Sequence, residues 1–216
     1  MLQRSREWIA ARAGSLGASS LWEAVSRTRS GFSASRANLL ARLAVERLTG
    51  IPCESYTSGP MQHGIDTEPE ARNAYAFDRS TEVEEVGLVP HPSIKGSHAS
   101  PDGLVETDGL VEIKCPNSAT HLDFLLTGEI PEKYVIQMLW QMACTGRKWC
   151  DYVSFDPRFP EEMRMRVKRI EADPERIKQL EKDVVIFLEE LESKILMLRN
   201  QVAPKAPKRK ERRAKK

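Results

Sequence analysis

The sequence lacks the features that mark membrane proteins, secreted proteins and nucleotide-driven machines. Its 216 residues contain no apolar run of about 18 residues that would span a bilayer. They also contain no segment with the charged start and apolar middle of a signal peptide, so we expect a cytoplasmic protein with no membrane partner. A glycine-rich phosphate loop, an ATP motif and internal repeats are all missing, which excludes P-loop motors and solenoids.

Cysteine and histidine are also scarce. The four cysteines form no C-x-x-C pair, so we expect reduced thiols rather than a zinc or redox site: Cys53, Cys115, Cys144 and Cys150. Three histidines have no metal-ligand spacing and are assigned no function: His63, His91 and His98. A hydrophobic content of 40% and a charged content of 30% indicate one ordinary folded domain, over residues 1–202.

What the sequence does contain is a short acidic motif at residues 100–114. Ser100-Pro101-Asp102-Gly103 is followed, after a turn at Thr107-Asp108-Gly109, by Glu112-Ile113-Lys114. Apolar segments flank the Asp-Gly step, so we predict an antiparallel hairpin. Because successive side chains of a strand point to opposite faces, Glu112 and Lys114 share one face while residues 111, 113 and 115 take the core face. Asp102 enters the partner strand close to Glu112.

Two carboxylates and one ammonium directed at a single point suit metal-dependent phosphodiester cleavage. Carboxylate oxygens favour Mg²⁺, with Mn²⁺ as a substitute, over zinc. The metal would polarise the scissile phosphate and lower the pKa of a bound water. Lys114 would orient or deprotonate that water, or neutralise the developing charge. The alternative is a surface hairpin with a solvated Glu-Lys pair, because an E-x-K triplet alone occurs by chance in charged proteins.

These motifs resemble a known nuclease signature. Pro101-Asp102 with Glu112-x-Lys114 is similar to the PD-(D/E)XK motif. The longer string from Ser100 to Pro116 resembles the phage lambda exonuclease, or YqaJ-type viral recombinase, family, and the likeness covers about residues 5–160. It implies an α/β (α+β) fold with a restriction-endonuclease-like core, in which helices flank a mixed central β-sheet. It also implies catalysis by Asp102, Glu112 and Lys114.

The resemblance adds a phosphate-binding group. It implies that Arg12, Ser19, Ser100 and Gln137 grip the terminal 5′-phosphate of DNA. Each of these residues also has a plainer interpretation. Arg12 is compatible with a solvent-facing helix position, Ser19 with a helix cap. Gln137 and Gln141 are four residues apart, which is compatible with the wet side of a helix.

The resemblance also adds metal ligands. It implies that Glu68 and the main-chain carbonyl of Ile113 bind the metal together with Asp102 and Glu112. The plainer interpretation of Glu68, which precedes Pro69, is an acid favoured by the dipole at the start of a helix.

One segment departs from the family pattern. Where relatives often have a longer basic stretch after Cys-Pro, this chain has Asn117-Ser118-Ala119-Thr120-His121, so no phosphate-binding arginine is assigned there. Thr120 or His121 is a candidate substitute. The plainer interpretation of His121 is a histidine on the surface of a helix.

Periodicity and breakers predict alternating helices and strands. Helices are expected near 3–12, 20–27, 33–49, 61–77, 118–127, 132–145 and 174–199, and strands near 82–89, 97–106, 109–115, 149–156 and 163–170. The last helix has an apolar stripe from Ile177 to Leu198, which either docks on the domain's own core or forms a subunit seam.

The charge distribution separates the carboxyl-terminal segment from the rest. The net charge is +2, but residues 203–216 have eight Lys or Arg against one Glu, or +7, which leaves −5 elsewhere. A basic, proline-containing segment of this kind is expected to be disordered and to hold DNA by counterion release. A solubilising segment is the alternative.

The function implied by the resemblance is digestion of one strand of duplex DNA from a 5′ end. A 3′ single strand would remain for annealing-type recombination of a phage in a bacterial host. A single-strand annealing protein is the implied partner, and a trimeric ring is the implied homo-oligomer. The two alternatives are an endonuclease of the restriction or repair type and a non-catalytic DNA-binding module.

Overall fold

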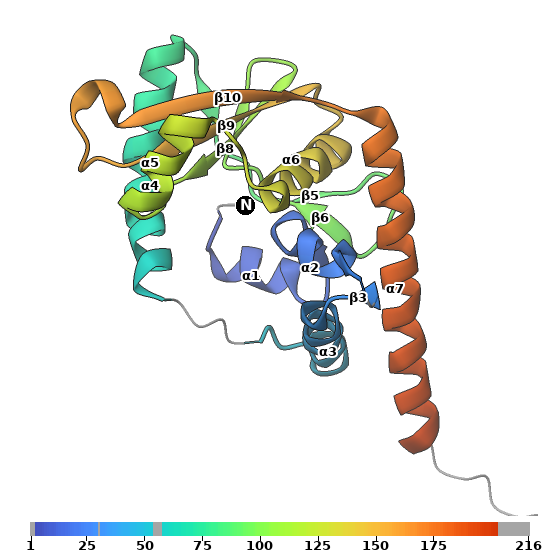
Figure 1. Ribbon diagram of the computed structural model, residues 1–216. Helices are drawn as coiled ribbons and strands as arrows, with labels where there is room; N and C mark the ends of the chain where they lie inside the picture. The colour runs from blue at the N-terminus through green and yellow to red at the C-terminus, as the bar shows by residue number, and fades with distance from the viewer. Residues whose placement is uncertain (1–2, 30, 54–57, 203–216) are drawn as a thin grey trace, which may run out of the picture.

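The computed structural model describes residues 3–29, 31–53 and 58–202, and a five-stranded mixed sheet lies at its centre (Figure 1). The strand order is β10-β9-β8-β7-β4, with bounds Val83–Glu84 (β4), Gly103–Val105 (β7), Gly109–Lys114 (β8), Trp149–Phe155 (β9) and Met165–Glu171 (β10). β8 and β9 are parallel, and the other neighbours are antiparallel. The expected mixed sheet is therefore confirmed. The basic segment 203–216 lies outside the described residues.

The predicted hairpin is the centre of this sheet. β7 and β8 pair antiparallel, and Val105 lies opposite Gly109 across the turn that contains Asp108. A Cβ atom at Gly109 would lie 2.1 Å from the ring of Trp149 on β9, so any larger residue there would force that ring to move. The sequence signal for the turn and the packing against the neighbouring strand therefore favour the same register.

Two predicted strands are divided between sheets. β5 (Val89–Pro90) and β6 (Ser97–Ala99) belong to a three-stranded sheet of order β1-β6-β5, in which β1 is Leu16–Gly17. The expected single strands over 82–89 and 97–106 were therefore wrong. Pro101 lacks an N–H to continue the ladder, so the chain leaves one sheet after Ala99 and enters the other at Gly103. A two-stranded ribbon, Arg27–Thr28 (β2) with Gly31–Phe32 (β3), had no clear sequence signal.

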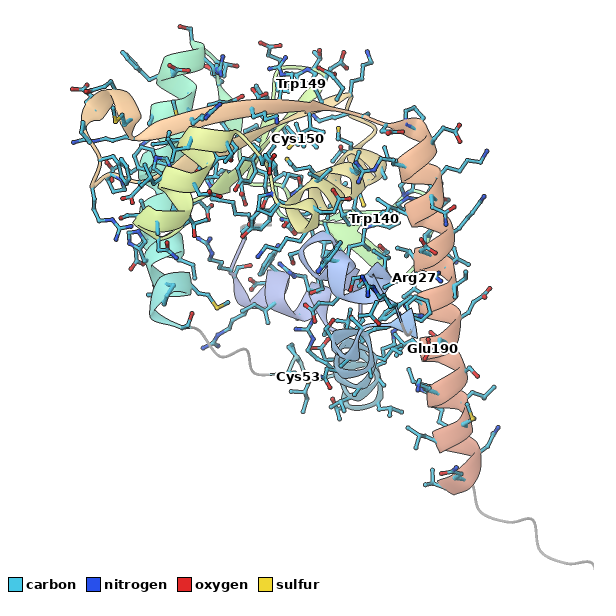
Figure 2. The ribbon with its side chains drawn as sticks, in the orientation of Figure 1. Arg27, Cys53, Trp140, Trp149, Cys150 and Glu190 are labelled. Carbon is cyan, nitrogen blue, oxygen red and sulfur yellow. The ribbon has the colours of Figure 1, made fainter. Side chains whose placement is uncertain are left out.

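Helices cover both faces of the central sheet. α4 (Gly59–Arg79) packs Ala71 and Tyr75 on one face, against residues 111 and 113 of β8 and 153 and 155 of β9. α6 (Glu132–Thr145) covers the opposite face with a buried apolar side that includes Trp140 (Figure 2). The indole of Trp140 donates to Ser97 Oγ at 3.0 Å and so joins α6 to the smaller sheet. β8 is therefore buried on both faces.

The long helix α7 (Pro174–Val202) lies beside α2 (Leu21–Val25) and α3 (Ala34–Thr49) at the edge of the molecule (Figure 1). Its apolar stripe is buried from Leu180 to Ile195, so docking on the domain's own core is confirmed for that part. Leu198 is 47% exposed. Arg36 of α3 forms an ion pair of 2.8 Å with Glu190 of α7, and Figure 2 labels Glu190.

The helix predictions were accurate at most boundaries. α5 (Ser118–Thr127) and α6 match the predicted ranges, whereas α1 (Arg6–Arg12) begins later than predicted because Ser5 caps it by accepting from Trp8 N at 3.2 Å. A short 3-10 helix, Ala18–Ser20 (η1), precedes α2, and another, Glu161–Met163 (η2), precedes β10. All four cysteines are free thiols. No helix in the described part of the chain is long and apolar enough to cross a membrane.

Candidate active site

A cavity of about 220 Å³ opens where α1, η1, α4, β8 and α6 converge. Its lining includes nine residues that sequence analysis selected for catalysis, metal binding or phosphate binding: Arg12, Ser19, Glu68, Ser100, Asp102, Glu112, Ile113, Lys114 and Gln137. The first and last of these residues, Arg12 and Gln137, are separated by 125 positions of sequence. The fold therefore brings them together around one space.

The hairpin register positions the first carboxylate. Gly103 pairs with Val111, so Asp102 follows the same ladder to a place beside Ile113, whose N–H donates to Asp102 Oδ2 at 2.7 Å. Burial, and then the negative charge of Glu112, raises the pKa of Asp102 well above its usual range. The site therefore concentrates negative charge away from water.

The second carboxylate is held from α6. Glu112 is 1% exposed and accepts from Gln137 Nε2 at 2.7 Å and from Gln141 Nε2 at 2.5 Å. Both glutamines are buried, so the interpretation of this helix face as wet was wrong. Sequence analysis passed over Gln141. Two glutamines one helical turn apart, facing a strand that contains an acid, were the available signal.

Lys114 forms an ion pair with Glu112 across the same face of β8. Burial alone would lower the pKa of Lys114, but the charges of Glu112 and Asp102 outweigh it and raise that pKa above its ordinary value. The ammonium group also lies 5.0 Å from the centre of the Tyr134 ring. The solvated Glu-Lys pair considered as an alternative is therefore wrong.

Glu68 reaches the cavity from the middle of α4. It accepts from Arg4 at 2.5 Å and from Arg72, one helical turn away, at 2.6 Å. Because α4 begins at Gly59, Glu68 is an interior residue, and its interpretation as a helix-start acid was wrong. Arg4 was not selected from the sequence because nothing near it in the chain indicates a partner 64 residues away.

The donor set fits a hard divalent cation. Glu68, Asp102 and Glu112 provide carboxylate oxygens, and Ile113 lines the same cavity. Within residues 3–29, 31–53 and 58–202, no three His, Cys, Asp or Glu side chains are gathered closely enough to hold a metal. The acids instead accept from internal donors, among them Arg4 on Glu68. The raised pKa of Asp102, caused by burial and by Glu112, indicates an excess of negative charge that a cation would neutralise.

Arg12 and the hydroxyl residues Ser19 and Ser100 form a second part of the cavity lining, which we call the cationic wall. The Arg12 guanidinium lies 3.9 Å from the ring centre of Trp8, whose indole donates to Ser100 Oγ at 3.1 Å. Burial, followed by the charge of Arg42, lowers the pKa of Arg12. Arg12 therefore borders the cavity partly desolvated and near a second cation, the kind of environment that favours an anion.

Ser19 belongs to η1 and lines the same wall. The residue at the N-cap of α2 is Ser20, which makes no capping hydrogen bond and instead accepts from Arg42 at 3.1 Å. The capping interpretation of Ser19 was therefore wrong.

Neither candidate after Cys115-Pro116 lines the cavity. Thr120 is exposed in the first turn of α5, and its N–H donates to Asn117 Oδ1 at 2.9 Å. His121 is fully buried and bonds to Ser154 Oγ at 2.7 Å and to the Met163 carbonyl at 2.9 Å. The prediction of a surface histidine was wrong, and the structure places His121 in packing. His98, which was assigned no function, does line the cavity.

The fold is that of the PD-(D/E)XK nucleases, which are phosphodiester hydrolases. A sequence profile of the YqaJ-like viral recombinase domain matches residues 7–148, and the chain belongs to this family. A comparison with curated proteins found no match.

Solved structures agree with this assignment. An alkaline exonuclease from Laribacter hongkongensis is 44% identical with a TM-score of 0.87, over 92% of this chain and 98% of that one. The same exonuclease in complex with dAMP is 45% identical, with the same TM-score and coverage. A phage-related exonuclease from Haemophilus somnus 129PT, 15% identical with a TM-score of 0.67 over 85% of this chain and 96% of that one, shares the fold.

Proposed function

We propose that the chain is a Mg²⁺-dependent 5′-to-3′ exonuclease that degrades one strand of duplex DNA from its ends and leaves 3′ overhangs. The observation that supports this proposal is a single cavity whose lining combines an acidic wall, made by Glu68, Asp102 and Glu112, with the cationic wall around Arg12. An endonuclease needs the first wall alone. The dAMP bound to the related exonuclease is the kind of mononucleotide that such an enzyme would release.

On the acidic wall, Glu68, Asp102, Glu112 and the Ile113 carbonyl would hold the metal. When bound, Mg²⁺, or Mn²⁺ in its place, polarises the scissile phosphate and lowers the pKa of a coordinated water. Lys114 donates to the attacking water and orients it, and its charge stabilises the developing negative charge on the phosphate. Gln137, which already donates to Glu112, fixes that carboxylate in its rotamer. It also contacts the terminal 5′-phosphate.

On the cationic wall, Arg12, Ser19 and Ser100 bind the terminal 5′-phosphate. The Trp8 indole, which donates to Ser100 and lies against the Arg12 guanidinium, holds both groups at fixed positions. A terminal phosphate held there places the next phosphodiester at the acidic wall. Cleavage then releases one nucleotide at a time.

The proposal includes partners. A single-strand annealing protein would receive the 3′ strand, and three copies would form a ring around the duplex, as the resemblance implies. The basic residues 203–216 would add salt-sensitive contacts with the phosphate backbone.

Digestion of linear duplex DNA tests the proposal. Rates are compared with and without Mg²⁺, on 5′-phosphorylated and 5′-hydroxyl ends, with a covalently closed circle as the control. We expect Mg²⁺-dependent loss that is faster from phosphorylated ends, with the circle intact. Cleavage of the circle would assign the chain to the endonucleases, and binding without any Mg²⁺-dependent cleavage would make it a DNA-binding module.

A further inference from the structure

His98, on β6, is a buried histidine with one unused nitrogen. Its side chain is 2% exposed, and Nδ1 lies 2.8 Å from Ser15 Oγ. Nε2 is buried and has no hydrogen-bond partner within the described residues. Buried polar atoms are nearly always satisfied, so an orphaned nitrogen beside a cavity indicates a missing ligand atom. His98 borders the active-site cavity.

The pairing of β1 with β6 directs this nitrogen toward the cationic wall. Gly17 lies opposite His98 in the parallel register. A Cβ atom on Gly17 would lie 3.0 Å from His98 Nε2 and 3.5 Å from Arg12 Nη2. The imidazole and the guanidinium therefore both approach the face of Gly17, and a side chain at residue 17 would crowd them.

The chemistry of that space favours a neutral donor. Burial, and then the charge of Arg12, lowers the pKa of His98 to about 4, so the imidazole is neutral near pH 7. A neutral ring that accepts the Ser15 hydroxyl hydrogen at Nδ1 has its own proton at Nε2. An N–H there would bind an anion beside Arg12 without the repulsion that a second cation would add.

We propose that His98 Nε2–H donates a hydrogen bond to the terminal 5′-phosphate of the DNA held by Arg12, in the tautomer whose Nδ1 accepts from the Ser15 hydroxyl. The inference rests on the proposed function, because it adds a residue to the same phosphate site. His98 is thus a specificity residue that helps the enzyme distinguish phosphorylated from hydroxyl ends.

Two variants of similar volume test this proposal. His98→Leu removes the donor, whereas His98→Gln keeps an amide N–H near the position of Nε2. The measurement is the ratio of single-turnover rates on otherwise identical duplexes with 5′-phosphate and 5′-hydroxyl ends. We expect His98→Leu to lower this ratio about tenfold, as for loss of a hydrogen bond to a charged group, and His98→Gln to keep most of it. Equal losses on both ends, or an unchanged ratio, would overturn the proposal.

Ser15→Ala provides a second variant if His98→Leu does not fold. Without the hydroxyl, Nε2 no longer has a fixed proton, and we expect the ratio to fall about two- to threefold. An unchanged ratio would contradict the role of His98. A wild-type enzyme that degrades linear DNA with no preference for phosphorylated ends would overturn both this inference and the phosphate site of the proposed function. Preference retained in every variant would overturn this inference alone.

Discussion

Two carboxylates on neighbouring strands are equally buried but differ in their sheet face, in their hydrogen-bond partners and in their access to the cavity. Glu112 on β8 and Asp151 on β9 are each 1% exposed. The parallel register pairs Asp151 with Val111, so the two acids lie on opposite faces of the sheet. Asp151 accepts from Tyr75 Oη at 2.8 Å and from Arg169 at 2.8 and 3.0 Å. It does not line the active-site cavity.

The difference lies in charge balance and access. Asp151 accepts from the Arg169 guanidinium through both carboxylate oxygens, so its charge is countered within the fold. Glu112 has Lys114 as its cation but lies beside Asp102, whose pKa is raised by burial and by Glu112. Burial alone therefore does not identify a functional acid. An unbalanced group of acids beside a cavity does.

The largest expected effect comes from neutralising each acid without changing its shape. Glu112→Gln removes a proposed metal ligand, and we expect kcat to fall by about 10²- to 10³-fold with a small change in Tm. Asp151→Asn leaves the half-exposed Arg169 without its counter-charge. We expect a loss of about 2 kcal/mol in the free energy of unfolding, a fall of about 4–8 °C in Tm, and an unchanged kcat.

The matched pair is measured by single-turnover cleavage at 25 °C and by thermal unfolding. Asp151→Asn is the control for general damage to the sheet, because it alters the adjacent strand on the other face. A comparable loss of kcat in both variants would contradict the division into a catalytic and a structural face.

The effect of Mg²⁺ on Tm distinguishes Glu112 from Asp151 without any measurement of activity. A cation that binds the folded state stabilises it by about 2.7 kcal/mol when present at one hundred times its dissociation constant. We therefore expect Mg²⁺ to raise the Tm of the wild type and of Asp151→Asn by several degrees, and to have little effect on Glu112→Gln. A magnesium shift retained in Glu112→Gln would remove this residue from the proposed ligands.

The sequence predicted the β7–β8 hairpin because local signals determine it. The Asp-Gly turn and the alternation from Leu110 to Lys114 are properties of adjacent residues, and the structure reproduces the pairing. The break after Ala99 was missed because its cause is a change of sheet, and the spacing of residues 97–106 does not record which strand lies alongside.

The candidate site followed a similar division. Asp102, Glu112 and Lys114 were selected because one motif contains them. The resemblance to the nuclease family added Glu68, Arg12 and Gln137. Gln141 and His98 were missed, since each is defined by an atom far away in the chain: Glu112 Oε2 in one case and the space over Gly17 in the other. For Gln141 the one local signal was its spacing of one helical turn from Gln137, and for His98 no neighbouring residue reveals the partner.

A smaller effect is expected from the donors behind each carboxylate. Gln141→Leu removes one donor to Glu112, and Tyr75→Phe removes one donor to Asp151. We expect Gln141→Leu to raise the Mg²⁺ concentration for half-maximal rate about tenfold, because the Gln141 amide orients the Glu112 carboxylate that would bind the metal. Tyr75→Phe should lower the free energy of unfolding by about 1 kcal/mol and leave the magnesium dependence unchanged. The same magnesium shift in both variants would show general loosening of the sheet.

The smallest effect concerns the pH dependence of stability that Tyr75, the donor to Asp151, produces. Burial, followed by the hydrogen bond to Asp151, raises the pKa of Tyr75 above its usual range. The folded state therefore keeps this proton when the unfolded chain releases it near pH 10, and stability is lost as the pH rises beyond that point. Tyr75→Phe has no such proton. We expect its Tm deficit relative to the wild type to narrow between pH 9 and about pH 11. A constant deficit would mean that Tyr75 is ionised as readily in the fold as in the unfolded chain, and that Asp151 holds no proton on its partner.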